Sequence, residues 1–475
     1  MRTTDGRSAR ATAEKADDRT RASLGASVFG VTAPPGCSAG GVGSLGLGPG
    51  EGEDGDDGSF AAPGAAGAFS CSFNRSASRR HPALPMNDAN ASAPPTRRSE
   101  RAATICMALF SDLRMASARP SESCKSLGAM RAITTLPGTA DSARLEEVPE
   151  PSDAPDTLLV DAIAIGVCGT DLEILSGAYG QAPPGRERLV IGHENVGRVR
   201  TAPPGSAFSP GDLVVGVVRR PDPVPCASCA AGEWDMCKNG KFTERGITGR
   251  DGYASERYRL ETAFAVPVPA TLGDLAVLVE PTTILAKAWE QIERIGARAS
   301  WSPSRVLVTG AGPIGLLAAL LGRQRGLEVH VLDRVTDGPK PTLVAALGAT
   351  YHTGRVSDIP LADIVLECTG VGELVFDVME NVGPDGIVCL TGVSSGARAI
   401  PINLTALNKQ MVLENNVVFG AVNANLRHYR AAVAALAQAD RSWLQQLISR
   451  RVPLERWPEA LVRGPNDVKP VIVFG

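Results

Sequence analysis

The pattern of hydrophobic and polar positions divides the chain near residue 130. Before that point, runs rich in Ala, Ser, Gly, Pro and Arg show neither a helical nor an alternating periodicity. Such a segment buries too little apolar surface to offset its chain entropy. We therefore predict that residues 1–129 are a disordered or mis-annotated leader and that Met130 is the real start. A genuine disordered tail is the alternative.

Short apolar segments recur after residue 130. Up to about residue 300 they alternate with Gly and Pro turns, which predicts short strands in a β-rich, barrel-like domain. From residue 306 onward, strand-like and helix-like segments alternate, which predicts a parallel, doubly wound α/β sheet. The predicted strands are 130–134, 158–165, 306–309, 329–332, 364–368, 387–390, 417–419 and 471–474, and the predicted helices are 314–326 and 429–439.

Composition narrows the class of protein. The 475 residues have 43% hydrophobic and 21% charged content and a net charge of −3, values of an ordinary globular protein. We expect no general attraction to nucleic acid or to an anionic membrane. The apolar runs stay below the roughly 18 residues that a membrane helix needs. Ten cysteines without a disulfide-like spacing favour a reducing, cytoplasmic compartment.

A glycine-rich turn follows the predicted strand 306–309 and opens a helix. Gly310 permits the tight turn, Gly312 lets the backbone approach a pyrophosphate, and Gly315 allows close helix packing. Asp333 ends the next strand, where an acid binds both ribose hydroxyls of NAD, while Arg334 beside it offers a cation to the 2′-phosphate of NADP. The predicted dinucleotide contacts are Gly310, Gly312, Pro313, Ile314, Gly315, Asp333 and Arg334.

Soft and borderline metal ligands lie in two glycine-rich segments. Cys168 follows an apolar strand, His193 and Glu194 follow another, and Glu280 comes later in the chain. Cysteine, imidazole and carboxylate with one open position are how proteins hold a catalytic zinc. A buried core cysteine and a hydrogen-bonded histidine are the alternative.

Two residues beside Cys168 have supporting roles in this hypothesis. Thr170 is two residues further on, so its hydroxyl can share a face with the metal. Asp171 can accept a hydrogen bond from the far nitrogen of His193. A metal beside a dinucleotide indicates alcohol oxidation by hydride transfer.

A second cluster consists of Cys226, Cys229 and Cys237. A closed structural zinc site needs four ligands, and Asp222 is the nearest candidate for the fourth. A metal-free loop with three thiols is the alternative.

Residues 130–475 resemble the zinc-dependent medium-chain dehydrogenases, and within them the glucose 1-dehydrogenase family. The segments that carry the resemblance are Gly-Val-Cys-Gly-Thr-Asp (166–171), Ala-Pro-Pro-Gly (182–185), Ile-Gly-His-Glu (191–194), Val-Arg-Arg-Pro (218–221), Asp-Met-Cys (235–237), Thr-Glu-Arg-Gly-Ile (243–247), Glu-Pro-Thr (280–282) and Val-Asn-Ala-Asn (422–425).

The resemblance implies a GroES-like catalytic domain at 130–304, to which 436–475 return, and a Rossmann NAD(P)-binding domain at 305–435. A homodimer or homotetramer is also implied. The first cysteine of the family's four-cysteine lobe is replaced by Pro223, which puts a structural zinc in doubt.

Several residue roles follow from the same resemblance. Cys168, His193 and either Glu194 or Glu280 would hold the catalytic zinc. Substrate contacts would come from Thr170, Glu244, Glu280 and Asn423. Two loops would cover the nicotinamide, namely Thr391, Gly392 and Val393, and Ala421, Val422 and Asn423.

The expected reaction is zinc-dependent oxidation of an aldose, D-glucose at C1, to gluconolactone with NAD or NADP, with Thr170 and Glu280 handling the proton. The sibling alternatives are enzymes for another aldose, a polyol or L-threonine. A zinc-free quinone reductase would lack Cys168 and His193. A nucleotide-sensing protein without turnover would need no metal ligands.

Overall fold

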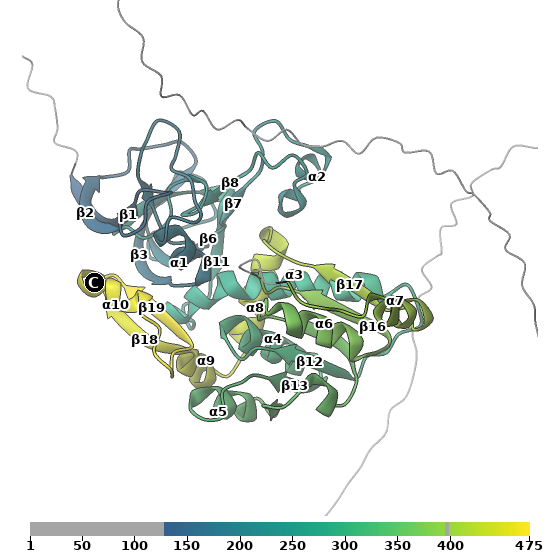
Figure 1. Cartoon of the computed structure of the whole chain (residues 1–475). Helices are drawn as coiled ribbons and strands as arrows, with labels where there is room; N and C mark the ends of the chain where they lie inside the picture. The colour runs from purple at the N-terminus through teal and green to yellow at the C-terminus, as the bar shows by residue number, and fades with distance from the viewer. Residues whose placement is uncertain (1–127, 395–398) are drawn as a thin grey trace, which may run out of the picture. The chain divides into compact units, whose positions relative to one another are not determined.

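The computed structural model describes residues 128–394 and 399–475. The predicted leader therefore lies outside the described residues, apart from its last two positions. Two large sheets organise the described part of the chain (Figure 1).

The first large sheet has seven strands in the order β11-β6-β5-β3-β19-β18, with β10 paired to β3. Alternate residues of β3 are buried, so this strand presents one face to a core. The C-terminal strand β19 runs antiparallel to β3, with Val471 opposite Gly166. The end of the chain therefore completes a sheet that begins some 300 residues earlier. The strands are β3 (Thr157–Gly166), β5 (Glu194–Thr201), β6 (Leu213–Gly216), β10 (Arg257–Glu261), β11 (Ala265–Val268), β18 (Ile448–Pro453) and β19 (Lys469–Val473).

Two three-stranded sheets accompany it, in the orders β2-β1-β4 and β7-β8-β9. Their strands are β1 (Ala129–Thr135), β2 (Arg144–Pro149), β4 (Leu189–Val190), β7 (Arg219–Arg220), β8 (Thr243–Arg245) and β9 (Gly249–Arg250). The short helices of this region are α1 (Gly169–Leu175), α2 (Ala227–Ala230), η1 (Trp234–Met236), η2 (Thr262–Phe264) and η3 (Gly273–Leu278).

The second large sheet is parallel and has the order β14-β13-β12-β15-β16-β17. Val306 and Val308 of β12 pack into one hydrophobic cluster, while Leu307 between them packs into another on the opposite face. Both faces are buried, which explains why its strands are continuous apolar runs. The strands are β12 (Arg305–Thr309), β13 (Glu328–Leu332), β14 (Thr350–His352), β15 (Ala362–Glu367), β16 (Val382–Leu390) and β17 (Val417–Gly420).

Helix α3 (Val279–Gly296) contradicts part of the sequence prediction, because short strands alone were expected up to residue 300. It packs against α4 and α8, and Trp289 on it is almost fully buried. It follows η3 directly, and Glu280 stands in its first turn. The remaining helices are α4 (Pro313–Gln324), α5 (Pro339–Ala346), α6 (Gly372–Glu380), α7 (Leu404–Leu413), α8 (Leu426–Gln438), α9 (Arg441–Leu447), α10 (Pro458–Leu461), η4 (Val356–Asp358) and η5 (Leu454–Arg456).

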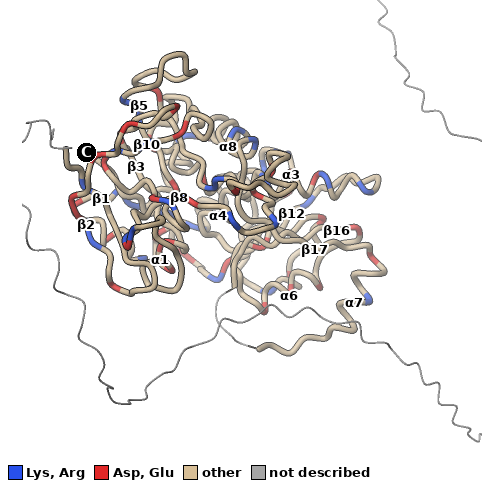
Figure 2. The backbone as a smooth tube through the Cα atoms, turned by 90° about the horizontal axis from the view of Figure 1, so that it is seen from above, with Lys and Arg blue, Asp and Glu red and all other residues tan. Residues whose placement is uncertain are grey.

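The fold is therefore α/β, with a β-rich part and a doubly wound parallel sheet. Acidic and basic residues are interspersed along the described chain (Figure 2). Of the helices in the described ranges, none has the length and apolar character needed to cross a membrane.

Candidate active site

Three of the predicted metal ligands converge. One ligand atom each from Cys168, His193 and Glu194 lies within 4.8 Å of the other two, and the Cys168 Sγ to His193 Nε2 distance is 3.0 Å. Cys168 follows β3 and precedes α1, while Glu194 begins β5, the neighbouring strand. A Cβ on Gly166 would come within 2.0 Å of Glu194 Oε2, so a larger residue there would displace this carboxylate.

Asp171 supports both ligands from the first turn of α1. Its Oδ2 accepts a hydrogen bond from the Cys168 backbone N–H at 2.9 Å, and its Oδ1 lies 3.4 Å from His193 Nδ1. Burial disfavours a charged imidazole, but the Cys168 sulfur and the Asp171 carboxylate raise the pKa of His193 well above its usual value.

Lys469 is a site residue that the sequence analysis missed. Its Nζ lies 2.6 Å from both carboxylate oxygens of Glu194, and both side chains are at least 97% buried. Nζ also donates to the Val167 carbonyl oxygen at 3.2 Å. A single lysine in the apolar C-terminal strand was the only signal in the sequence. Glu194 is thus held by a counter-charge beside the prospective metal.

Glu280 lies outside this group of three ligands, but two of the ligands affect its pKa. Burial raises the pKa of Glu280 to about 7; the nearby His193 lowers it and Glu194 raises it. A carboxyl with a pKa near neutrality suits proton transfer at physiological pH. Thr170 stands half-buried in the first turn of α1, two residues from Cys168.

The donor set fits zinc. A sulfur, an imidazole nitrogen and a carboxylate oxygen are the ligands that Zn²⁺ takes in proteins, and a three-ligand site leaves a position open for substrate. The observation that supports this fit is the convergence of these three ligand types, with their ligand atoms within 4.8 Å of one another.

The glycine-rich turn connects β12 to α4. Gly310 has φ 86°, and a Cβ on Gly315 would lie 1.7 Å from the Gly310 carbonyl oxygen. A Cβ on Gly312 would meet no atom within 4 Å, which leaves open space beside the helix N-terminus. Pro313 is the first residue of α4 and Ile314 the second, so the turn can receive a pyrophosphate as the motif predicts.

Asp333 follows β13 at the same edge of the sheet. Its carboxylate accepts hydrogen bonds from the backbone N–H groups of Ala311 at 2.6 Å and Val335 at 3.0 Å, and it pairs with Lys340 Nζ at 3.1 Å. These contacts outweigh burial and lower the pKa of Asp333. Arg334 is exposed. Lys340 is a second cation here that the sequence analysis did not single out.

The two predicted nicotinamide loops follow neighbouring strands of this sheet. Thr391, Gly392 and Val393 come after β16, and the Thr391 hydroxyl donates to the Glu367 carbonyl oxygen at 2.8 Å. Ala421, Val422 and Asn423 come after β17, and the Ala421 N–H donates to the Leu390 carbonyl oxygen at 2.9 Å. In a parallel sheet the ends of these strands share one edge, which is where open α/β sheets bind ligands.

Glu244, a predicted sugar contact, lies in β8 and is 96% buried. Its Oε1 accepts a hydrogen bond from Arg219 Nε at 3.0 Å. Asn423, the second predicted sugar contact, has φ 63°, a left-handed backbone conformation that asparagine tolerates better than most residues. The hydrogen bond from Arg219 thus fixes the Glu244 carboxylate.

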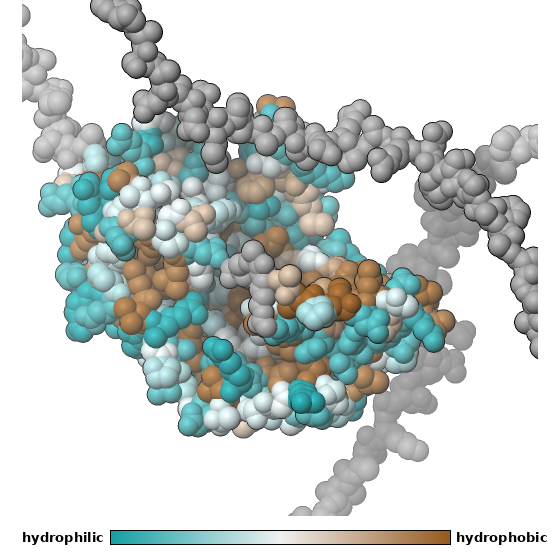
Figure 3. All heavy atoms as spheres, in the orientation of Figure 1, coloured by the Kyte–Doolittle hydropathy of each residue, from teal (hydrophilic) through white to brown (hydrophobic). Residues whose placement is uncertain are grey.

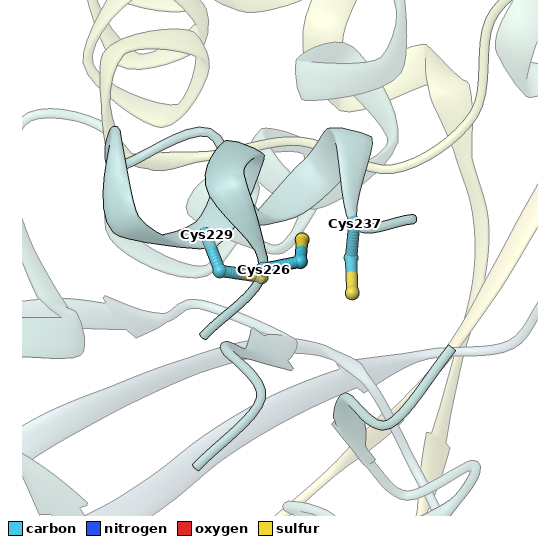
Figure 4. A group of neighbouring side chains, drawn as sticks. All are labelled: Cys226, Cys229 and Cys237. Carbon is cyan, nitrogen blue, oxygen red and sulfur yellow. The ribbon is translucent and has the colours of Figure 1, made fainter. Parts of the chain in front are cut away.

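The second cysteine cluster is also assembled. Cys226 directly precedes α2, Cys229 lies on α2, and Cys237 follows η1. Their sulfur atoms lie within 4.8 Å of one another (Figure 4). The backbone N–H groups of Lys238 and Cys229 lower the pKa of the Cys226 thiol to about 6. Thiolate is the form that binds metal.

Asp222 is turned elsewhere in this structure. Its Oδ1 accepts a hydrogen bond from the Val224 N–H at 2.9 Å, and its Oδ2 accepts one from Asn239 Nδ2. The structure thus gathers the three thiols without bringing the predicted fourth ligand among them.

We expect Cys229→Ala to lower the zinc content by about one equivalent per chain if these three thiols hold a metal, with lower stability, because bound metal contributes to folding. Metal analysis of the purified protein is the measurement. An unchanged zinc content would show that the thiol cluster is empty.

We expect Lys469→Met to lower the free energy of unfolding by about 3–5 kcal/mol, since removing one partner leaves a buried charge unpaired. The double variant Glu194→Gln/Lys469→Met should recover much of that loss. Denaturant unfolding measures both. A single variant as stable as the parent would contradict the buried pair.

Comparisons with known proteins cover both parts of the fold. The family model described as the alcohol dehydrogenase GroES-like domain matches residues 154–270. The model described as the glucose dehydrogenase C-terminus matches residues 273–474.

Whole proteins give the same picture. The chain is 40% identical over 359 residues to glucose 1-dehydrogenase of Methanocella arvoryzae, covering 73% of this chain and 100% of that protein. It is 40% identical over 353 residues to glucose 1-dehydrogenase of Thermoproteus tenax, covering 72% and 99%. Its structure is similar to that of Haloferax mediterranei glucose dehydrogenase in complex with NADP, Zn and gluconolactone, with a TM-score of 0.68, 31% identity and coverage of 73% and 99%.

Proposed function

Because the chain belongs to the glucose 1-dehydrogenase family of zinc-dependent medium-chain dehydrogenases, we infer that it oxidises D-glucose at C1 to gluconolactone with NAD or NADP as the hydride acceptor. The observation that carries this conclusion is the convergence of Cys168, His193 and Glu194 in a chain that also has a dinucleotide turn. A zinc-free reductase does not need that convergence.

Cys168, His193 and Glu194 are the residues that would hold the zinc. When bound, the zinc supplies a Lewis acid for the substrate oxygen and the nicotinamide supplies the hydride acceptor. Lys469 restrains Glu194, and Asp171 orients His193. This division of roles keeps Glu280 available for a different task.

Proton removal is assigned to Thr170 and Glu280. The Thr170 hydroxyl would accept the proton of the C1 hydroxyl and pass its own outward to Glu280 or water. A pKa of about 7 leaves a large fraction of Glu280 ionised at neutral pH and able to take that proton.

Glu244 and Asn423 are proposed to bind the remaining sugar hydroxyls. A site built from buried hydrogen-bonding groups rejects analogues that lack the matching hydroxyls. The burial of Glu244 and its hydrogen bond from Arg219 support this role for Glu244.

We propose that residues 130–304 with 436–475 act as the catalytic domain and 305–435 as the dinucleotide-binding domain. The return of β18 and β19 to the sheet of β3 supports that division.

A homodimer or homotetramer is proposed as the assembly. The exposed side chains of Ile402, Leu404, Val412 and Leu413 lie on and around α7, where apolar and polar residues are interspersed on the surface (Figure 3). A cytoplasmic location is part of the proposal because the described cysteines are free thiols.

Initial rates on D-glucose, D-galactose, a polyol and L-threonine, each with NAD and NADP, test the function. We expect the highest kcat/KM with D-glucose and gluconolactone as the product. A higher value with a polyol or L-threonine would assign the chain to a sibling activity. Tight cofactor binding without turnover of any substrate would indicate a nucleotide sensor.

A further inference from the structure

A buried ion pair joins the cysteine-bearing loop to helix α3. Asp235 lies in η1, two residues before Cys237, and Lys287 lies on α3. The Lys287 Nζ to Asp235 Oδ2 distance is 2.9 Å, and the side chains are 3% and 0% exposed. Apolar residues of similar volume often replace such a pair at no loss of stability. Stability alone therefore does not explain the presence of this ion pair.

One branch of contacts fixes the loop after β17. Lys287 Nζ donates to the Val422 carbonyl oxygen at 2.9 Å, and Asn425 Nδ2 donates to Asp235 Oδ1 at 2.8 Å. Asn423, in its left-handed conformation, stands between these two anchored residues. The pair thus restrains both sides of a residue assigned to the sugar, within a loop assigned to the nicotinamide.

A second branch reaches Glu244. Arg219 Nη1 donates to the Asp235 carbonyl oxygen at 3.4 Å, and Arg219 Nε donates to Glu244 Oε1 at 3.0 Å. Arg219, Glu244 and Asp235 are all more than 90% buried, so this chain of contacts is shielded from water. Asp235 therefore connects the two groups that we assign to sugar binding.

We propose that Asp235 and Lys287 are positioning residues that couple sugar binding to cofactor binding. Cofactor on the 421–423 loop fixes Lys287 and Asp235, which in turn set Arg219 and Glu244 for the sugar. The inference rests on the proposed function, because it takes Glu244 and Asn423 as sugar contacts. Coupling of this kind is reciprocal, so each ligand tightens the other by the same factor.

The test uses the full chain and the double variant Asp235→Leu/Lys287→Met, which exchanges the charged pair for an apolar one. Asp235→Asn is the second variant. Its amide oxygen can still accept the hydrogen bond from Asn425, while the negative charge and the oxygen that faces Lys287 are lost. Glu293→Gln is the matched control, because Glu293 is also on α3 but forms an exposed pair with Arg325. Melting temperature and zinc content identify any variant whose fold is damaged.

The Kd of the reduced cofactor is measured by nicotinamide fluorescence with and without saturating D-glucose, a combination that does not turn over. In the parent and in Glu293→Gln we expect glucose to lower this Kd by at least about fivefold. The coupling ratio is the Kd without glucose divided by the Kd with glucose. In the double variant this ratio should approach one, while the melting temperature and the zinc content stay at the parental values. Asp235→Asn should lower the ratio to half of the parental value or less.

Two outcomes would overturn the proposal: a parent in which glucose leaves the cofactor Kd unchanged, or variants that keep the parental ratio. If the double variant unfolds, Asp235→Asn decides by the same criterion. Failure of the parent to oxidise glucose would instead refute the proposed function. Oxidation of glucose together with unchanged coupling in the variants would refute this inference alone.

Discussion

Replacing Cys168 by Ser or His193 by Ala is expected to remove the catalytic zinc and to lower kcat/KM for glucose at least about 10³-fold, or about 4 kcal/mol. Each change takes one ligand from a group whose atoms lie within 4.8 Å of one another. Two remaining ligands are too few for a zinc site of this kind. Without these ligands the site would lack the Lewis acid that bound zinc would supply for the substrate oxygen.

Metal analysis and initial rates measure this effect on the same samples. NAD(P) affinity should change little, because the glycine-rich turn follows β12 of the parallel sheet, whereas the metal ligands belong to the sheet that contains β3 and β5. His352→Ala is the control, since this half-buried histidine lies in β14 at the far edge of that sheet. Variants that keep both zinc and parental rates would refute the ligand assignment.

Asp333→Ala is expected to raise the NADP over NAD ratio of kcat/KM more than tenfold, which corresponds to about 1.4 kcal/mol. The carboxylate can accept hydrogen bonds from both ribose hydroxyls of NAD, but it repels a 2′-phosphate. Arg334 acts in the opposite direction by offering a planar cation to that phosphate. Lys340, 3.1 Å from the carboxylate, adds a second cation on the same side.

The cofactor ratios of Arg334→Ala and Lys340→Ala separate these contributions. If the cations dominate, the parent already prefers NADP, and these two variants lose NADP activity selectively. Asp337→Asn is the control, because this exposed acid lies in the same loop. If the ratio is the same in all four variants as in the parent, the side chains point away from the ribose and our interpretation of this strand end is wrong.

The parallel sheet could be predicted closely from the sequence. Residues 306–309 and 329–332 were expected as strands and lie in β12 and β13. Strands buried on both faces are short, continuous apolar runs between glycines, and few other elements have that pattern. The glycine-rich turn could also be predicted, because its three glycines are required by local steric contacts.

Helix α3 and Lys469 could not be predicted in this way. Helix α3 begins directly after the 3-10 turn η3, and its N-cap is Leu278, whose side chain cannot cap a backbone N–H, so the polar residue that usually marks a helix start is missing. Lys469 meets Glu194 across 275 residues of sequence. Local periodicity contains no information about such a contact, which depends on how β19 pairs with β3.

The return of β19 to the first sheet also has a consequence for biosynthesis. A ribosome releases the chain from its N-terminus, so Cys168, His193 and Glu194 emerge long before Lys469. Until then Glu194 lacks its counter-charge and β3 lacks a neighbouring strand. We therefore expect zinc loading to follow the end of translation. Nascent chains that stop before residue 469 should not assemble a working centre, even though all three metal ligands have been made.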